Sequence, residues 1–559
     1  MEIRLYKTKN RRNMKLYKIF LMMFGVLLFA ACDDVDNMEP AGGSLTAAQL
    51  QETNKDVPSR TEASFVGLFA DLGTPMLYYG TSSRRADDFA FISAAISQDL
   101  EGADMSSLNN DYNWFSTACE LSTRTPNYAN PSMRYGVPYR LVGKANDIIN
   151  SIPADATDSS SVVKVASARA ARAFAYLSLA PYFQFSYTKA ADEPCIPMIK
   201  EGVDMANNPR ATVREVYEAI VEDLTFAVDN LKGYKRSSKQ YIDQNVAYGL
   251  RARAYLNMGK YAEAAADAAQ ALKGYTPYTL EEVSAPGFYD INDHNWMWGI
   301  IITQAMVNRS NYCSVNTPAS WLSPFSGDGY TAGAQCYPII NKMLYDKIPD
   351  TDIRKQWWLD GECWSPFLDT QSWDGVTGKA LVDLFIQDVK TVMLPYTGVK
   401  FGMKTGCGST LNTNDWPLMR AEEMILVEIE GLAKSGKEAE AKTKLENFVK
   451  TYRDPQYTIP TTRSLADEIW FQRRVELWGE GFFTSDAKRQ NKPIVRFHGS
   501  PSTCNFPEAF VFNIEANDGW LNMRFPQVET NTNLGVVNNV DGSQPVPGQN
   551  PGLRDGVTD

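Results

Sequence analysis

Histidine is almost absent from this chain, which limits the chemistry that it can perform. Of 559 residues, only His294 and His498 are histidines. A metal site built on several imidazoles is therefore excluded, and a Ser/His/Asp triad would have only two candidate bases. The sequence also lacks a G-x-S-x-G nucleophile elbow and a G-x-x-x-x-G-K-[ST] phosphate loop, because Gly375 to Ala380 has the wrong spacing and no hydroxyl after its lysine.

Charged residues form two clusters that could have a catalytic or metal-binding role. The first contains Arg473, Arg474, Glu476, Glu480 and Asp486. Their helical spacing favours salt bridges between helices over an acid–base pair. The second contains Asp99, Glu101 and Asp104, whose oxygens suit calcium although their spacing matches no EF-hand loop. We predict no catalytic residue, no metal and no cofactor.

Aromatic rings supply the remaining chemistry. The chain has 12 Trp and 27 Tyr, and seven of the Trp fall between residues 288 and 373: Trp296, Trp298, Trp321, Trp357, Trp358, Trp364 and Trp373. A flat ring can cover the apolar C–H face of a sugar, while Asn, Asp, Gln or Arg side chains bond its hydroxyl rim. We expect most of these Trp to fill a core, and a smaller number to be displayed on loops.

The N-terminal segment is predicted to be a targeting signal. Seven basic residues precede an apolar run over residues 19–31, which is too short to span a bilayer and ends at Cys32. This resembles a bacterial lipoprotein signal, with Cys32 as the lipidated first residue. An ordinary secretory cleavage site is the alternative. Asp33, Asp34 and Asp36 resemble the surface-export signal of lipoproteins in the Bacteroidetes.

Charge excludes one class of partner. Loss of residues 1–31 removes seven basic residues and one acidic residue, so the net charge changes from −11 to −17. Such an acidic chain is not expected to bind nucleic acid.

Apolar periodicity predicts a helical scaffold that must position these residues. Helices are expected over 135–152, 162–185, 213–231, 246–257, 261–272 and 421–434. The pattern x-Gly-Lys-x-Ala-Glu-Ala occurs at Gly259 and again at Gly436, and resembles the corner of a tetratricopeptide helix pair. A Trp-, Gly- and Pro-containing insertion, 275–413, separates the two copies, with one clear strand at 298–303. Residues 535–559 should form an extended or mobile tail.

An ordered set of segments identifies a family resemblance. The segments are 169–176, 208–217, the hairpin at Gly259, 414–423 and 468–481, which reads Glu-Ile-Trp-Phe-Gln-Arg-Arg-Val-Glu-Leu-Trp-Gly-Glu-Gly. Together with Cys32 they resemble the SusD/RagB family of outer-membrane nutrient-uptake lipoproteins. The resemblance implies a single domain over residues 32–559. That domain is mostly α, with about four pairs of tetratricopeptide-like helical hairpins packed against an irregular, loop-rich half with few short strands.

The resemblance also implies a function. Family members capture oligosaccharide, or occasionally peptide, at the cell surface above a TonB-dependent, SusC-like transporter, and they are not catalytic. Lipid on Cys32 would anchor the protein in the outer membrane, facing the cell exterior. Two alternatives stay open: a glycoside hydrolase, which needs two carboxylates about 5–10 Å apart, and a scaffold that binds peptides or proteins.

In the family, ligand contacts tend to come from two loop zones. The corresponding zones here are 106–115 and 308–330. The candidate glycan-binding residues within them are Asn110, Tyr112, Trp114, Tyr312, Trp321 and Tyr330. Arg84 and Arg85, in the turn Thr81-Ser-Ser-Arg-Arg, could bond a ligand or an acidic sugar, but a solvated surface pair is favoured.

Overall fold

The computed structural model describes residues 58–108, 114–200, 202–310, 312–329, 337–383, 385–386, 389–390 and 393–559. The predicted signal segment and Cys32 lie outside these residues. The chain divides into two compact units, Met1–Thr61 and Glu62–Asp559. The first contributes only the start of helix α3 to the described residues, and the fold belongs to the second.

Helices make up most of the regular structure. They are α3 (Pro58–Ala70), α4 (Ala90–Leu100), α5 (Ser116–Cys119), α6 (Ala129–Ser151), α7 (Ser159–Phe183), α8 (Tyr187–Ala190), α9 (Val213–Asn230), α10 (Gln244–Asn257), α11 (Tyr261–Ala271), α12 (Gln304–Val307), α13 (Pro318–Leu322), α15 (Lys342–Lys347), α16 (Ala421–Lys434), α17 (Glu438–Tyr452), α18 (Leu465–Glu476), α19 (Phe483–Gln490) and α20 (Gln527–Thr532). The prediction of a mostly α fold is confirmed. No described helix has the length and apolarity that crossing a bilayer requires.

Strands are short and pair only in twos among the described residues. They are β1 (Met105–Ser106), β2 (Pro194–Pro197), β3 (Arg210–Thr212), β4 (Trp296–Ile300), β5 (Ile339–Ile340), β6 (Ser372–Trp373), β7 (Val376–Thr377), β8 (Phe385–Ile386), β9 (Val389–Lys390) and β10 (Trp416–Arg420). The pairs are β1–β5, β2–β3, β4–β10, β6–β7 and β8–β9, all antiparallel.

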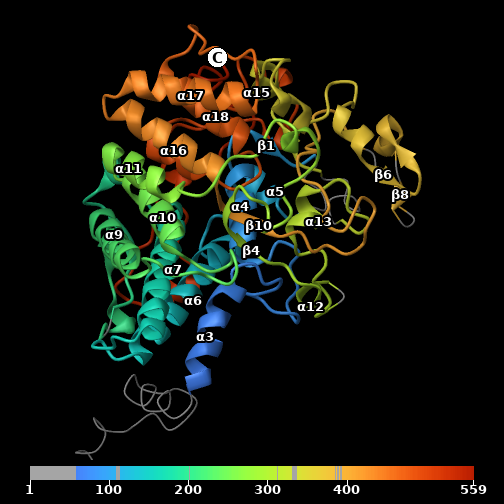
Figure 1. Cartoon of the computed structure of the whole chain (residues 1–559). Coiled ribbons are helices and arrows are strands. Elements are labelled where there is room, and N and C mark those ends of the chain that lie inside the picture. The colour runs from blue at the N-terminus through green and yellow to red at the C-terminus, as the bar shows by residue number, and fades with distance from the viewer. Residues whose placement is uncertain are drawn as a thin grey trace, which may run out of the picture. The chain divides into compact units, whose positions relative to one another are not determined.

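The long helices pack in a continuous stack. Consecutive helices α6, α7, α9, α10 and α11 each lie against the next, and α11 then packs on α16 although the insertion separates them in sequence. In Figure 1 the stack runs up the left of the view, from α6 and α7 at the bottom to α16 and α17 at the top. Gly431 permits the close approach of α16 to α11, because a Cβ there would lie 2.6 Å from the Tyr261 carbonyl oxygen. The expected scaffold of helical hairpins is confirmed.

Local sequence accounts for the ends of several helices. Thr212 and Glu215 form a capping box at the start of α9, and the Asp243 carboxylate accepts the Val246 N–H at the start of α10. Gly259 and Gly436 have φ values of +72° and +86° at the two repeat corners. Such left-handed backbone favours glycine, which explains the shared motif.

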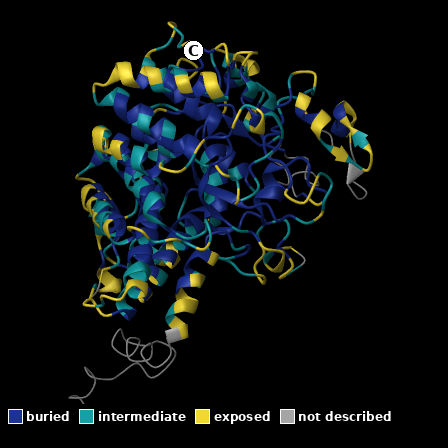
Figure 2. Ribbon diagram, viewed as in Figure 1, coloured by how far each residue is buried: buried dark blue, intermediate teal, exposed yellow. Residues whose placement is uncertain are grey.

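The insertion forms the loop-rich half and contributes to the core. Its strand β4 pairs with β10, which leads directly into α16, so both ends of the insertion are fastened to the helical stack. Five of its seven Trp are buried: Trp296, Trp298, Trp321, Trp357 and Trp358. Figure 2 shows that dark, buried residues occupy both halves. Most of the Trp excess therefore serves packing.

The first charged cluster forms a buried network between helices and loops. Glu476 pairs with Arg453 at 2.8 Å and with Arg420 at 3.0 Å. Glu480 pairs with Arg420 at 2.7 Å and with Lys400 at 2.6 Å. The predicted role of these residues in salt bridges is confirmed.

The carboxylates of Asp99, Glu101 and Asp104 each bind a different partner. Asp99 accepts the N–H groups of Gly481, Phe482 and Phe483 at 2.9–3.0 Å. The Glu101 carboxylate lies 3.0 Å from Arg124, and the Asp104 carboxylate lies 2.6 Å from Arg474. These carboxylates therefore fix the chain locally, each at a different place.

Candidate functional site

Three loops bring rings and guanidinium groups together at the surface. The loop between α3 and α4 carries Tyr79, Arg84 and Arg85; Trp114 precedes α5 and Tyr312 follows α12. The Arg84 guanidinium carbon lies 4.0 Å from the centroid of the Tyr312 ring. The Arg85 guanidinium carbon lies 4.7 Å from the Trp114 ring and 5.9 Å from the Tyr79 ring. With Tyr78, these residues are called the aromatic–arginine surface.

Buried carboxylates hold this surface in place. Asp88 accepts the backbone N–H of Tyr78 at 3.1 Å and that of Tyr79 at 2.8 Å. Burial raises the pKa of the Asp88 carboxyl, and these two N–H groups oppose the rise. Asp87 accepts two hydrogen bonds from Arg85, at 3.0 and 2.9 Å, so the charge of Arg85 is neutralised.

The second loop zone, 308–330, is fastened to the loop between α3 and α4 by one amide. The Asn316 side-chain nitrogen donates to the carbonyl oxygens of Arg85 at 2.6 Å and Asp88 at 3.0 Å. Asn316 is fully buried, so these bonds are protected from water. The segment that carries Tyr312 is therefore held beside the Arg84–Arg85 turn.

The rings of this surface retain access to solvent. Tyr312 is 46% exposed, while Tyr78, Tyr79 and Trp114 are half-buried. The Tyr78 and Tyr79 rings meet edge to face, with centroids 4.8 Å apart. Exposed rings beside fixed hydrogen-bonding groups are able to stack against the apolar face of a sugar and to bond its hydroxyl groups.

The structure places two of the six predicted ligand-binding residues on this surface. Trp114 and Tyr312 are brought together there through Arg85 and Arg84. The predicted residues Asn110, Tyr112 and Tyr330 lie outside the described residues.

Trp321 requires a correction. It is only 3% exposed, its ring packs edge-on against Phe115 at 4.6 Å, and its indole N–H donates to the Ala86 carbonyl oxygen at 3.2 Å. Its ring faces therefore contact the protein. Because Phe115 follows Trp114 and Ala86 follows Arg85, Trp321 supports the surface from the core.

The sequence interpretation missed Tyr78 and Tyr79, and it favoured a solvated pair for Arg84 and Arg85. Instead, both arginines stack on rings, and Arg85 is half-buried. The available signal was a Tyr-Tyr pair just before a Gly-Thr-Ser-Ser-Arg-Arg turn, which places aromatic and cationic side chains on one short loop.

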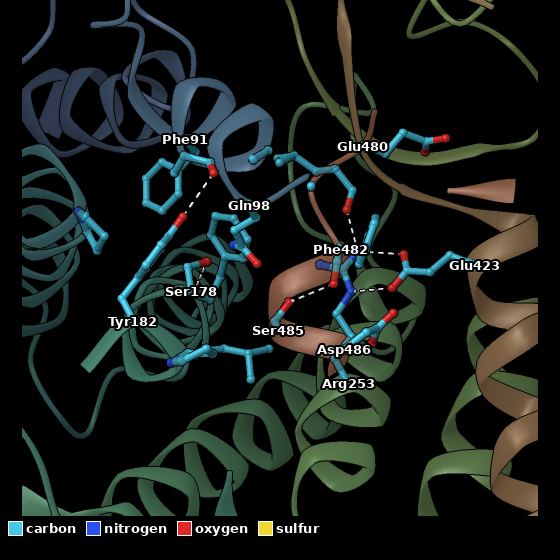
Figure 3. A pocket seen from close by; sticks show the side chains of 18 of the residues that line it. Phe91, Gln98, Ser178, Tyr182, Arg253, Glu423, Glu480, Phe482, Ser485 and Asp486 are labelled. Atoms are coloured by element: carbon cyan, nitrogen blue, oxygen red, sulfur yellow. Dashed lines mark hydrogen bonds and ion pairs between the residues drawn. The ribbon is translucent and has the colours of Figure 1, made fainter. Parts of the chain in front are cut away.

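A separate cavity lies between helices α4, α6, α7, α10 and α19 (Figure 3). Phe91, Gln98 and Tyr182 line one part of it, and Arg253 and Glu423 line another. Its volume is about 130 Å³. Ligand pockets usually measure about 300–1,000 Å³, so this cavity is too small for an oligosaccharide. Arg253 and Glu423 pair at 2.6 Å, so these two charges are mutually satisfied. Of these two sites, the aromatic–arginine surface is the better candidate.

Comparisons with known proteins agree with this fold. A family model described as "Starch-binding associating with outer membrane" matches residues 81–256, and the SusD family model matches residues 293–544. The chain is 22% identical to a SusD-like carbohydrate-binding protein from Bacteroides vulgatus, with a TM-score of 0.67 over 86% of this chain and 97% of that one.

Two further structures show the same likeness. A SusD superfamily protein from Bacteroides thetaiotaomicron is 21% identical, with a TM-score of 0.65 over 86% of this chain and 99% of that one. A laminarin-binding SusD-like protein is 17% identical, with a TM-score of 0.59 over 86% and 98% of the two chains. No curated protein matches the sequence.

Proposed function

Because the chain belongs to the SusD/RagB family, we propose that it is a non-catalytic, cell-surface lipoprotein that binds glycans. The observation that carries this proposal is the aromatic–arginine surface, where one exposed ring, Tyr312, and half-buried rings from two other loops lie beside fixed polar groups. Two relatives of the same fold are described by their names as binding carbohydrate and laminarin. Trp114 and Tyr312 are the proposed stacking residues.

The carboxylates at this surface support binding over hydrolysis. A glycosidase needs one carboxylic acid and one carboxylate free to reach the substrate. Asp87 is instead paired with Arg85, and Asp88 is buried and accepts two backbone N–H groups. Incubation with a bound glycan should therefore release no shorter products.

Delivery to a SusC-like, TonB-dependent transporter is the proposed next step. Val528, Leu534, Val537, Val540 and Val546, all near the C-terminus, are each at least 60% exposed. Single exposed apolar side chains are common, but five along one segment offer surface that a protein partner would cover.

Lipid on Cys32 is the proposed anchor in the outer membrane, with the binding surface outside the cell. A Cys32→Ala variant should leave the outer-membrane fraction, and protease added to intact cells should degrade the wild type. Protection from that protease would contradict the exterior location.

Affinity electrophoresis of the full-length protein through gels containing polysaccharides tests the binding function. Trp114→Ala and Tyr312→Ala should each weaken retardation by the bound glycan, roughly 5- to 30-fold, because each removes about 1–2 kcal/mol of apolar contact. Tyr255→Ala is the matched control, since Tyr255 on α10 is also a half-buried ring beside an arginine, Arg251, at 5.7 Å.

Glycan binding and the position of the site can be contradicted by different results. Retardation that is unchanged in both surface variants would contradict the position of the site. A wild type that no polysaccharide retards would contradict glycan binding itself.

A further inference from the structure

Two arginines beside the aromatic–arginine surface have no ion-pair partner among the described residues. The Arg84 Nε donates to the Thr81 carbonyl oxygen at 3.2 Å, and Arg309 donates to the Pro75 carbonyl oxygen. Both side chains are exposed, and in the described part of the chain no carboxylate pairs with either. Arg85, by contrast, is neutralised by Asp87 at 2.9 Å. No described carboxylate therefore compensates the positive charges of Arg84 and Arg309.

Their positions connect both charges to the proposed stacking rings. Arg84 lies over the Tyr312 ring at 4.0 Å. Arg309 is three residues before Tyr312, and it bonds the loop on which Tyr78 and Tyr79 follow Pro75. A ligand ring stacked on this surface would thus lie beside one or both guanidinium groups.

The described carboxylates of these loops, Asp87, Asp88 and Asp328, do not form ion pairs with Arg84 or Arg309. Asp87 is occupied by Arg85, and Asp88 is buried beneath the loop, where it accepts backbone N–H groups. Asp328 is exposed on its own loop and accepts a hydrogen bond from Ser314 at 3.3 Å. None of the three is placed in an ion pair with Arg84 or Arg309.

Stacking also prepares Arg84 to bind an anion. The Tyr312 ring restrains the planar guanidinium, so less side-chain entropy is lost when a ligand binds. The terminal nitrogens Nη1 and Nη2 present the fork that matches a carboxylate or a sulfate. A neutral hydroxyl would use only one arm of this fork and would not need its charge.

We propose that the ligand is an acidic glycan, in which Arg84, assisted by Arg309, binds uronate carboxylates or sulfate esters while Tyr312 and Trp114 contact the sugar rings. This inference rests on the proposed glycan-binding function and narrows its ligand class. The net charge of −17 expected after loss of residues 1–31 disfavours a polyanion at long range. Charges farther than about 8 Å are screened at physiological salt, so the local arginines determine whether an anionic group binds at this surface.

The experiment compares acidic polysaccharides with neutral forms of the same backbone. The acidic probes are polygalacturonate, alginate and chondroitin sulfate. The neutral counterparts of polygalacturonate and alginate are their methyl esters, and that of chondroitin sulfate is its desulfated methyl ester. Calorimetric titration of the full-length protein should show tighter binding of at least one acidic form than of its neutral partner. Arg84→Gln should reduce this preference roughly tenfold, the size of one charge-assisted bidentate contact.

Salt and a matched control complete the design. The acidic preference should weaken between 50 and 300 mM NaCl in the wild type and depend less on salt in Arg84→Gln. Arg309→Gln should reduce the preference less, and the double variant should abolish it. Lys437→Gln, which removes one exposed charge at the corner between α16 and α17, should leave it unchanged. Thermal unfolding confirms that every variant is folded.

The possible outcomes test the acidic-glycan inference separately from the proposed glycan-binding function. Neutral polysaccharides that bind as well as the acidic ones, or an acidic preference that survives the double variant, would overturn the inference while glycan binding stands. Absence of binding to every acidic and neutral polysaccharide would overturn both.

Discussion

Trp114 and Trp321 lie near the same short segment of chain but in different environments. Trp114 is half-buried beside the Arg85 guanidinium, whereas the Trp321 ring packs against Phe115 in the core. We expect Trp321→Ala to lower the free energy of unfolding by about 3–5 kcal/mol, because it leaves a cavity. Trp114→Ala should lower it by about 1 kcal/mol or less. Urea unfolding followed by circular dichroism measures both, and equal losses would contradict these assignments.

Residue type alone could not separate these two tryptophans. The sequence predicted that both loop zones supply rings, and Trp114 and Tyr312 do lie on one surface. It could not predict that Trp321 faces the core, because its neighbours Ala86 and Phe115 come from distant parts of the chain. Arg84 likewise contacts Tyr312, which is distant in sequence. The sequence alone therefore favoured a solvated pair for Arg84 and Arg85.

At the scale of elements, helix type was predictable, whereas some helix ends were not. The start of α16 matches the prediction, but α6 begins at Ala129 and not at residue 135. Asn130 and Pro131 resemble a turn signal, yet proline is tolerated in the first turn of a helix, where its missing N–H has no helical partner. The strand expected at 298–303 is observed as β4 over 296–300, and its partner β10 lies beyond the insertion and left no local signal.

Glu430 joins two helices through buried charge. Its carboxylate, on α16, lies 2.5 Å from Arg489 on α19 and 2.6 Å from Lys434. Burial alone would raise the pKa of Glu430, but Arg489 and Lys434 outweigh it and hold that pKa well below the ordinary range. We expect Glu430→Gln to cost about 3–5 kcal/mol at pH 7, because Arg489 loses a buried partner.

The same ion pair predicts a pH dependence of known sign. Because the pKa of Glu430 is lower in the folded state, the unfolded chain binds the proton first as pH falls. The stabilisation is complete above about pH 4.3, the unfolded value, and is lost at lower pH. The stability difference between wild type and Glu430→Gln, measured by urea unfolding, should therefore shrink below that pH.

Glu428 on the same helix provides the control for this experiment. Its carboxylate pairs with the half-exposed Lys444 at 3.0 Å. Glu428→Gln should cost no more than about 1 kcal/mol, as for surface pairs. If the two variants had equal costs, or if the Glu430→Gln difference did not change with pH, the buried ion pair would not be the cause.

At the scale of the whole molecule, the family resemblance predicted the fold class better than local patterns did. Two repeat corners, at Gly259 and Gly436, indicated a helical stack with an insertion, and α11 does pack on α16 across that insertion. Composition could not predict that the insertion's tryptophans fill the core. Trp296 and Trp298 are fully buried because β4 lies between the stack and the loops, with no residue of the strand exposed.

The C-terminal segment ties distant parts of the molecule together. Residues 535–559 contain no helix or strand, in agreement with an extended path, but their ends are anchored. Asn539 donates to the carbonyl oxygens of Phe183 and Met523 at 2.9 and 2.8 Å. Asp555 pairs with Arg474 on α18 at 2.5 Å, and that same arginine holds Asp104. Composition predicted the absence of regular structure but not this anchoring.

Removal of residues 553–559 should therefore destabilise the whole domain. The truncation takes Asp555 from Arg474, whose side chain is only 1% exposed, and removes the buried Val557. We expect a loss of about 3–5 kcal/mol, because a buried guanidinium loses one of its two partners. Asp555→Asn should reproduce most of this loss, whereas Asp541→Asn, at an exposed position, should change stability by less than about 0.5 kcal/mol. Urea unfolding measures each variant, and a truncated protein as stable as wild type would mean that the segment lies on the domain without supporting it.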